Sequence, residues 1–350
     1  MDLPPNPHLQ GPAGARRRAV QLADGQLVRQ SLPVPGRAIP LLLEAAVAGV
    51  DLTGWAAAHL ERLEALLLEH RALLFRGFAV DGAAGLRRFC AATAGGQLLD
   101  YRDRSSPRHE VGDRVYTSTD YPAEQAIRMH NEGTYWVTCP RKIYFFCHVA
   151  PERGGETPIA DGRRVLARLD PDLAARFADR RLLYLRNYND GFGLPWQTVF
   201  QTADRGEVER YCRANAIALE WKDGDRLRTR QLRPALVRHP GTGEVLWFNH
   251  AAFFHVSSLE PQLRAALLAE FAEEELPYNT YFGDGSAIPA DDLEAVRRAY
   301  QEETVLFPWR QGDLLMLDNL TVAHGRQPFT GRREILVGMA QPYERDDIPR

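Results

Sequence analysis

Residues 129–136 read MHNEGTYW, and residues 318–339 read DNLTVAHGRQPFTGRREILVGM. The first stretch places His130 two positions before Glu132. On a β-strand, residues i and i+2 share a face, so both side chains could reach one ion from a common strand. In the second stretch, we expect a strand, an Asp-Asn turn and a second short strand that brings His324 next to a glycine. The two stretches together predict one metal site built from His130, Glu132 and His324.

Two histidines and one carboxylate form the facial triad of non-haem Fe(II) oxygenases, which leaves positions on the ion open. An isolated His-x-Glu pair is common by chance, and His324 alone would be interpreted as a satisfied polar residue in a turn. The combination favours a metal. We expect five other histidines to be structural or exposed: His59, His70, His109, His148 and His239.

Short apolar runs dominate the chain from about residue 97 onward. They are rich in aromatic and branched residues and are separated by Gly and Pro turn signals, which is typical of a sandwich or barrel. The predicted strands are KIYFFCHVA (142–150), RLLYLRNY (181–188), GEVLWFNH (243–250), ETVLFPW (303–309), DLLMLDN (313–319) and EILVGMA (334–340). We therefore predict an α+β fold with a double-stranded β-helix (jelly-roll) core and flanking helices.

Helical periodicity appears in four other segments. The predicted helices cover residues 54–70, 83–92, 261–275 and 291–300, and the first one leads into the apolar strand ALLFRGF. Residues 1–30 are rich in Pro, Gly and Arg, and we expect a loose N-terminal segment there. Residues 31–350 are predicted to form a single jelly-roll domain with helical insertions.

Composition limits the function classes. The chain has 350 residues, 45% hydrophobic and 25% charged, with a formal net charge of -3, which gives no reason to expect nucleic acid as a partner. Four cysteines without a CxxC pair indicate free thiols in a reducing compartment. The first twenty residues lack the apolar core of a secretory signal, and no run of 18 apolar residues exists to cross a membrane. We expect a cytoplasmic protein.

The motifs then point to a known family. They are LLFRGF (73–78), MHNEGTYW, GGETPIADGRRV from Gly154, WQTVFQT from Trp196, HPGTGEVLWFN from His239, YFGDG from Tyr281 and DNLTVAHGRQPFTGRREILV. Taken together, the sequence resembles the TauD/TfdA-type Fe(II)- and 2-oxoglutarate-dependent dioxygenases. It is most similar to the SyrP-like branch found in natural-product pathways.

The resemblance implies roles for individual residues. His130, Glu132 and His324 would ligate Fe(II), and O2 would take the position that 2-oxoglutarate leaves open, with ascorbate as an optional reductant. Thr157, in GGETP, stands where the family places a threonine that binds the distal carboxylate of 2-oxoglutarate. Arg333 precedes the final strand, as the family's cosubstrate arginine does, and a guanidinium can hold a carboxylate with two parallel hydrogen bonds.

Three further residues are interpreted through the same resemblance. Val337 stands where the taurine-type members carry a second arginine for the substrate's anionic group, so a sulfonate held in that manner is not expected. Related halogenases replace the metal carboxylate with a small residue, and the presence of Glu132 therefore favours oxygen transfer. Arg326 is expected to brace a loop.

The substrate is less constrained by the sequence. Asn131, Arg186 and Asn249 are candidate substrate contacts, although packing roles are equally open for them, and Arg186 suits a substrate carboxylate best. The resemblance implies hydroxylation of an unactivated carbon in an amino acid or an aminoacyl or peptidyl intermediate, as a small molecule or bound to a carrier protein. Desaturation, epoxidation and cyclisation remain open as reaction outcomes. A non-catalytic metal-binding jelly-roll and a zinc hydrolase remain open as alternative functions. The chain could also form a homo-oligomer.

Overall fold

The computed structural model describes residues 27–96, 98–100, 103, 108–112, 114–188 and 193–345. The predicted loose N-terminal segment lies largely outside these residues. Its last residues belong to strand β1, Val28–Ser31, which pairs with β2, Leu41–Ala45.

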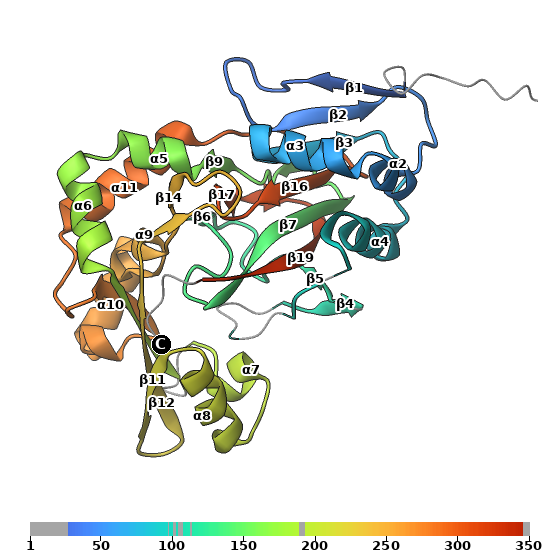
Figure 1. Ribbon diagram of the computed structural model, residues 1–350. Helices are drawn as coiled ribbons and strands as arrows, with labels where there is room; N and C mark the ends of the chain where they lie inside the picture. Colours follow the sequence, from blue (N-terminus) through green and yellow to red (C-terminus); the bar gives the residue numbers. More distant parts are fainter. Residues whose placement is uncertain are drawn as a thin grey trace, which may run out of the picture.

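A large mixed sheet forms the centre of the molecule, with strand order β1-β2-β3-β16-β7-β19-β5-β4 (Figure 1). Only β2 and β3 pair in parallel; the other neighbours are antiparallel. The remaining strands of this sheet are β3 (Ala72–Arg76), β4 (Glu110–Gly112), β5 (Val115–Thr117), β7 (Thr138–Val149), β16 (Leu314–Asp318) and β19 (Glu334–Glu344).

Alternation along β7 gives the sheet two buried faces. Tyr144 and Phe146 belong to the apolar cluster on the side of helices α2 (Leu52–Ala58), α3 (Leu60–His70) and α4 (Gly82–Ala94). Ile143 and Phe145 belong to the cluster on the opposite side. Successive side chains of a strand point to opposite faces, so a strand buried on both sides is apolar throughout. The second face carries the candidate site.

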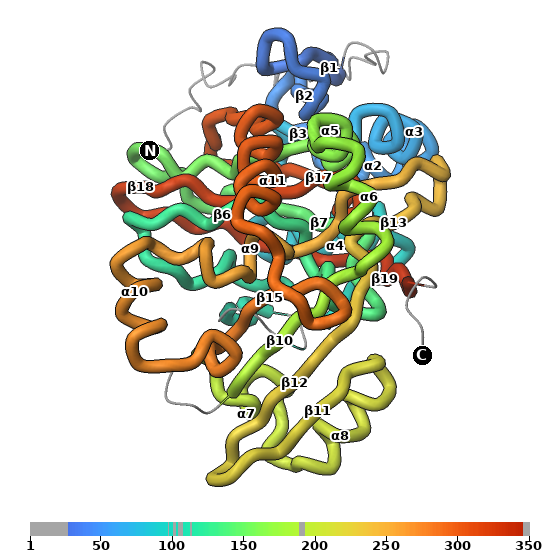
Figure 2. The backbone as a smooth tube through the Cα atoms, turned by 90° about the vertical axis from the view of Figure 1, so that its left-hand side faces the viewer, coloured from blue at the N-terminus to red at the C-terminus, as the bar shows by residue number. Residues whose placement is uncertain are grey.

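Smaller sheets cover that second face (Figures 1 and 2). The three-stranded sheet β6-β17-β9 supplies two of the predicted metal ligands. The strands of the smaller sheets are β6 (Ile127–His130), β9 (Ile159–Asp161), β17 (Val322–Arg326), β13 (Leu236–Arg238), β14 (Val245–Trp247), β8 (Arg153–Gly154), β18 (Phe329–Thr330), β10 (Leu182–Tyr188), β11 (Ile217–Lys222), β12 (Arg226–Arg233) and β15 (Tyr278–Phe282).

The helices lie around these sheets. Helices α5, α6 and α11 lie together along one side, while α7 and α8 accompany the hairpin β11–β12 as it extends from the body (Figure 2). The bounds are α2 (Leu52–Ala58), α3 (Leu60–His70), α4 (Gly82–Ala94), α5 (Gly162–Arg168), α6 (Pro171–Arg180), α7 (Trp196–Phe200), α8 (Arg205–Ala214), α9 (Ala251–Phe254), α10 (Pro261–Glu270) and α11 (Ala290–Glu303). None of the described helices combines the length and apolar character that a membrane crossing requires.

Three predicted elements are wrong in detail. The helix expected over 54–70 is broken at His59, whose φ of -125° leaves the helical region, so α2 and α3 are separate. The helix expected over 261–275 ends at Glu270 and is followed by a short 3₁₀ turn, Glu273–Glu275. The strand expected over 303–309 is reduced to one bridge between Val305 and Ile159.

The structural roles expected for several polar and thiol groups are confirmed. All four cysteines are buried and free: Cys90, Cys139, Cys147 and Cys212. His239 is fully buried, and its Nε2 lies 2.9 Å from Asp318 Oδ2. Its Nδ1 accepts hydrogen bonds from the backbone N–H groups of Gly241 and Thr242.

Candidate metal centre

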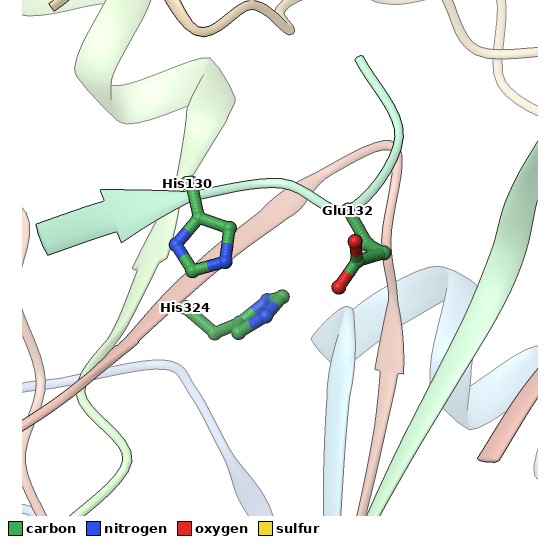
Figure 3. A group of neighbouring side chains, drawn as sticks. All are labelled: His130, Glu132 and His324. Carbon is green, nitrogen blue, oxygen red and sulfur yellow. The ribbon is translucent and has the colours of Figure 1, made fainter. Parts of the chain in front are cut away.

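Two antiparallel strands bring the distant histidines together. His324, on β17, is the register partner of His130 at the end of β6, and their ring centroids are 4.6 Å apart. Figure 3 shows both rings and the Glu132 carboxylate turned toward a common centre. One potential ligand atom from each of the three residues lies within 4.8 Å of the others, and all three residues are buried. This spacing suits a single metal ion.

Glu132 is not on the same strand as His130, which corrects the expectation of a shared strand face. β6 ends at His130, and Glu132 lies in the turn that follows. Gly133 has a φ of +69° there, and a Cβ at this position would lie 2.3 Å from the Trp136 ring. The turn therefore requires glycine. It directs the Glu132 carboxylate toward the histidines, whereas the sequence predicted that a shared strand face would do so.

Asn319, which belongs to the second quoted stretch (residues 318–339), holds this turn in place. Its Oδ1 accepts the Glu132 N–H at 2.8 Å, while its Nδ2 donates to the carbonyl oxygens of Glu132 and Pro140 at 2.9 and 2.8 Å. Asn131 Nδ2 donates in turn to the Asn319 carbonyl at 2.7 Å. Buried amides with this many bonds hold the backbone in one arrangement, so the Asp-Asn turn positions the carboxylate as well as His324.

The surroundings of His130 and His324 favour the neutral form of both imidazoles. His130 Nδ1–H donates to the Arg128 carbonyl at 2.8 Å, which leaves a lone pair on Nε2, as metal-ligating histidines commonly arrange. Burial lowers the pKa of His130 from its ordinary value. Burial and the neighbouring His130 hold the pKa of His324 well below its ordinary value. His324 Nδ1 is buried and finds no hydrogen-bond partner among the described residues. Two neutral imidazoles beside a buried carboxylate fit a divalent cation.

Gly325 permits the close approach of the two ligand-bearing strands. A Cβ on Gly325 would lie 2.6 Å from the Ile127 carbonyl oxygen of β6, and the strand register shifts between His324 and Arg326. The group that approaches Gly325 is therefore the backbone of β6.

Gly325→Ala is expected to push β6 away from β17 and separate the two imidazoles. We expect a loss of about 1–3 kcal/mol in the free energy of unfolding, as for other overpacked sites, together with weaker binding of divalent metal. Urea denaturation of the metal-free protein and calorimetric titration with Co(II) measure the two effects. Unchanged metal affinity would show that the strand spacing does not control the site.

Arg108 is a site residue that the sequence did not reveal. Its Nη2 donates to Glu132 Oε2 at 2.6 Å, and both side chains are 5% exposed. A buried, charge-assisted bond of this kind is among the stronger hydrogen bonds in proteins. The segment RHE around Arg108 carries no spacing or motif that would have singled it out.

A cavity of about 30 Å³ adjoins two of the three predicted ligands, His130 and His324. Thr157 and Arg333, the predicted cosubstrate residues, both line it. The rest of its lining is Arg108, Ser118, Thr119, Ile127, His130, Phe145, His324, Gly325, Arg326, Ile335 and Val337. The structure thus brings the predicted cosubstrate pair to the same cavity as the two histidines.

The two cosubstrate candidates are held by specific contacts. Arg333 Nε donates to the Gly155 carbonyl at 2.8 Å, and Thr157 Oγ1 accepts from Trp309 Nε1 at 3.1 Å. Burial and the neighbouring Arg326 lower the pKa of Arg333 to about 10, so its guanidinium remains charged at neutral pH. A positive, largely buried group beside a metal site is suited to an anionic ligand.

Arg326 has the bracing role that we expected. Its guanidinium donates to the backbone carbonyls of Tyr121, Pro122 and Gln125 at 2.9, 2.5 and 2.8 Å. These bonds fasten the loop before β6 to β17. Val337 also lines the cavity, and its apolar side chain supplies no positive charge there.

The three substrate candidates are not among the residues that line this cavity in the described chain. Arg186 Nη1 donates to Asp103 Oδ1 at 2.5 Å, and the guanidinium lies between the rings of Tyr135 and Tyr188. Asn249 Nδ2 donates to the Ala235 carbonyl at 2.8 Å, and its Oδ1 accepts the Ala251 N–H at the start of α9. These contacts hold the side chains of Arg186 and Asn249 in place. A contact of Asn131, Arg186 or Asn249 with substrate stays a prediction.

Comparison with known proteins adds the family context. Residues 35–339 match the family described as taurine catabolism dioxygenase TauD, TfdA family. The chain is 41% identical over 280 residues to the dapdiamide synthesis protein DdaC of Enterobacter agglomerans, covering 80% of this chain and 85% of that protein. It is 30% identical over 323 residues to a clavaminate synthase-like protein of Arabidopsis thaliana, covering 89% and 91%.

Solved structures share the fold. PvcB, described as an Fe, alpha-ketoglutarate dependent oxygenase from an isonitrile synthetic pathway, matches with a TM-score of 0.55 and 21% identity, covering 95% of this chain and 100% of that one. A taurine dioxygenase-type protein of Burkholderia xenovorans matches with a TM-score of 0.52 and 16% identity, covering 91% and 92%. The predicted jelly-roll core with flanking helices is thereby confirmed.

Proposed function

Because the chain belongs to the TauD/TfdA family of Fe(II)- and 2-oxoglutarate-dependent dioxygenases, we propose that His130, Glu132 and His324 hold its iron. The observation that carries this proposal is the convergence of three buried ligand atoms within 4.8 Å of one another. The donor set supports it further, since two imidazoles and one carboxylate match the triad of this iron class. His130 would present Nε2 to the ion, because its Nδ1–H donates to a backbone carbonyl.

We propose that 2-oxoglutarate binds in the adjoining cavity. Arg333 would pair with its distal carboxylate and Thr157 would donate its hydroxyl to the same group, since both line the cavity beside the histidines. The Trp309 N–H bond occupies Thr157 Oγ1 as an acceptor, which leaves its hydroxyl hydrogen to donate. A zinc hydrolase or a simple metal-binding protein would not need this dicarboxylate site.

When bound, iron and 2-oxoglutarate would allow O2 to act as the oxidant that an unactivated carbon requires. The protein's own residues orient the metal ligands and enclose the site. Asn319 holds the Glu132 backbone, and Phe145 packs against the His324 ring at a centroid distance of 4.9 Å. Phe253 stacks on His130 at 4.5 Å. These apolar contacts exclude water and fix the imidazoles, which favours reaction with the substrate over side reactions.

For the substrate, we propose an amino acid or an aminoacyl or peptidyl intermediate of a biosynthetic route, hydroxylated at an unactivated carbon. The relative with 41% identity is named for dapdiamide synthesis, which supports a biosynthetic role. The intact carboxylate at Glu132 supports oxygen transfer over halogenation.

Substrate-stimulated succinate formation tests this proposal. The purified protein would be supplied with Fe(II), 2-oxoglutarate and O2, together with free amino acids in one series and aminoacyl carrier proteins in another. We expect one series to stimulate succinate release and to yield a product heavier by one oxygen atom in mass spectrometry. Stimulation with a product lighter by two hydrogens would replace hydroxylation by desaturation. No stimulation in either series would contradict the substrate class while leaving the cofactor assignment in place.

A further inference from the structure

We propose that Arg108 is a positioning residue of the metal centre, and that it makes Glu132 a ligand through one oxygen only. The inference rests on the proposed role of Glu132 as an iron ligand. It assigns to Arg108 a task that none of the sequence motifs indicates: keeping a coordination position of the ion available.

The geometry that supports this is the contact between Arg108 Nη2 and Glu132 Oε2, at 2.6 Å between two side chains that are each 5% exposed. Arg108 also lines the cavity that His130 and His324 line, and its side chain is buried rather than on the protein surface. One carboxylate oxygen, Oε2, is therefore engaged by a cation of the protein, and we assign the other oxygen, Oε1, to the ion.

The number of oxygens that Glu132 contributes decides how the ion can be used. A six-coordinate ion with three protein ligands would retain three positions, of which 2-oxoglutarate would take two if it binds as a chelate. A carboxylate can also bind an ion through both oxygens. If Glu132 did so, the protein would fill four positions and the chelate the other two, and no position would remain for a small third ligand. A strong bond from Arg108 to Oε2 opposes that arrangement.

Charge balance points in the same direction. A buried carboxylate that loses its ion-pair partner is strongly disfavoured, because burial removes the water that would otherwise stabilise it. Without the Arg108 guanidinium, the bound metal becomes the cation that must compensate both carboxylate oxygens. Two-oxygen binding then becomes favourable. Residues that hold metal ligands in this way commonly change affinity or activity about 10–100-fold when they are replaced.

Arg108→Gln, Arg108→Met and Arg108→Lys separate this role from simple packing. Glutamine and methionine remove the charge, whereas lysine keeps a charged donor. Arg114→Met provides a matched control, because Arg114 lies in the same part of the chain and pairs with Asp100 with about half of each side chain exposed. Circular dichroism of the metal-free proteins identifies the variants that fold.

Two measurements follow on the folded variants. Calorimetric titration with Co(II) gives the metal affinity, and electron paramagnetic resonance of the anaerobic Fe(II) and 2-oxoglutarate form gives the affinity for nitric oxide, a probe of the remaining position. We expect Arg108→Gln or Arg108→Met to lose about tenfold or more in nitric oxide affinity, while Arg108→Lys and Arg114→Met stay close to the wild-type value.

The outcomes discriminate among the alternatives. Equal nitric oxide affinity in the wild type and the uncharged variants would overturn the inference. An equal loss in Arg108→Lys would overturn it as well, because shape rather than charge would then be responsible. Failure of the wild-type protein itself to bind Co(II) or Fe(II) would instead contradict the proposed metal site, and so the two failures are distinguishable.

Discussion

His324→Ala is expected to abolish turnover and to lower Fe(II) affinity by more than about a hundredfold. Replacing residues that merely support metal ligands already costs about 10–100-fold, and His324 would supply one of the three protein ligands itself. The remaining pair, His130 and Glu132, lies on a strand end and its turn and cannot enclose an ion alone. Anaerobic calorimetry with Fe(II), paired with succinate release under O2, measures both effects.

His70→Ala serves as the control for this variant, since His70 is at the end of α3 and its Nε2 lies 3.7 Å from the exposed carboxylate of Glu69. It should bind Fe(II) like the wild type. Because His324 is buried next to Phe145, the alanine variant must also be compared with the metal-free wild type in urea denaturation. Retained turnover in a folded His324→Ala protein would refute the assignment of His324 as a ligand.

Arg333→Gln is expected to raise the 2-oxoglutarate requirement about 10–100-fold, with a much smaller change in Fe(II) affinity. A charge-assisted hydrogen bond contributes roughly 1.5–3 kcal/mol, and each 1.4 kcal/mol corresponds to about a tenfold change in affinity. Glutamine can still donate to the Gly155 carbonyl, so the loop should survive the change. The KM for 2-oxoglutarate, and its affinity in the anaerobic Fe(II) form, measure the effect.

The adjacent Arg332 offers a matched control. Its side chain is 76% exposed and pairs with Glu334 at the surface. Surface pairs of this kind contribute little, so Arg332→Gln should leave the 2-oxoglutarate affinity unchanged. If Arg332→Gln and Arg333→Gln had equal effects, or if neither changed the 2-oxoglutarate requirement, the cosubstrate would have to bind elsewhere.

The residue types at the centre of the site could be predicted from the sequence, because each motif carries its own chemistry. The strand-turn-strand before His324 folds as expected, with β16 ending at Asp318 and β17 beginning at Val322. His130 and His324 become register partners, as the prediction of one shared metal site requires. Arg333 and Thr157 were assigned through the resemblance, and the fold brings both to the cavity beside the histidines.

Other contacts between distant segments could not be predicted, because no motif with its own chemistry links them. Glu132 reaches the site through a turn held by Asn319, and nothing in the spacing of MHNEGTYW distinguishes such a turn from a continued strand. Arg108 pairs with Glu132 from a segment without any motif. Arg186 remains a substrate candidate, and its partner Asp103 lies far away in the sequence, where no motif marks it. Single-sequence patterns describe local periodicity and do not specify which charge meets which.

The most direct test of the iron and 2-oxoglutarate site is the visible absorption of the anaerobic protein during titration with Fe(II) in the presence of 2-oxoglutarate. We predict a weak charge-transfer band that needs both components, saturates at one Fe(II) per chain, and disappears in His324→Ala. A protein that binds Fe(II) tightly yet shows no band with 2-oxoglutarate, or that gives the same band in His324→Ala, would contradict the account.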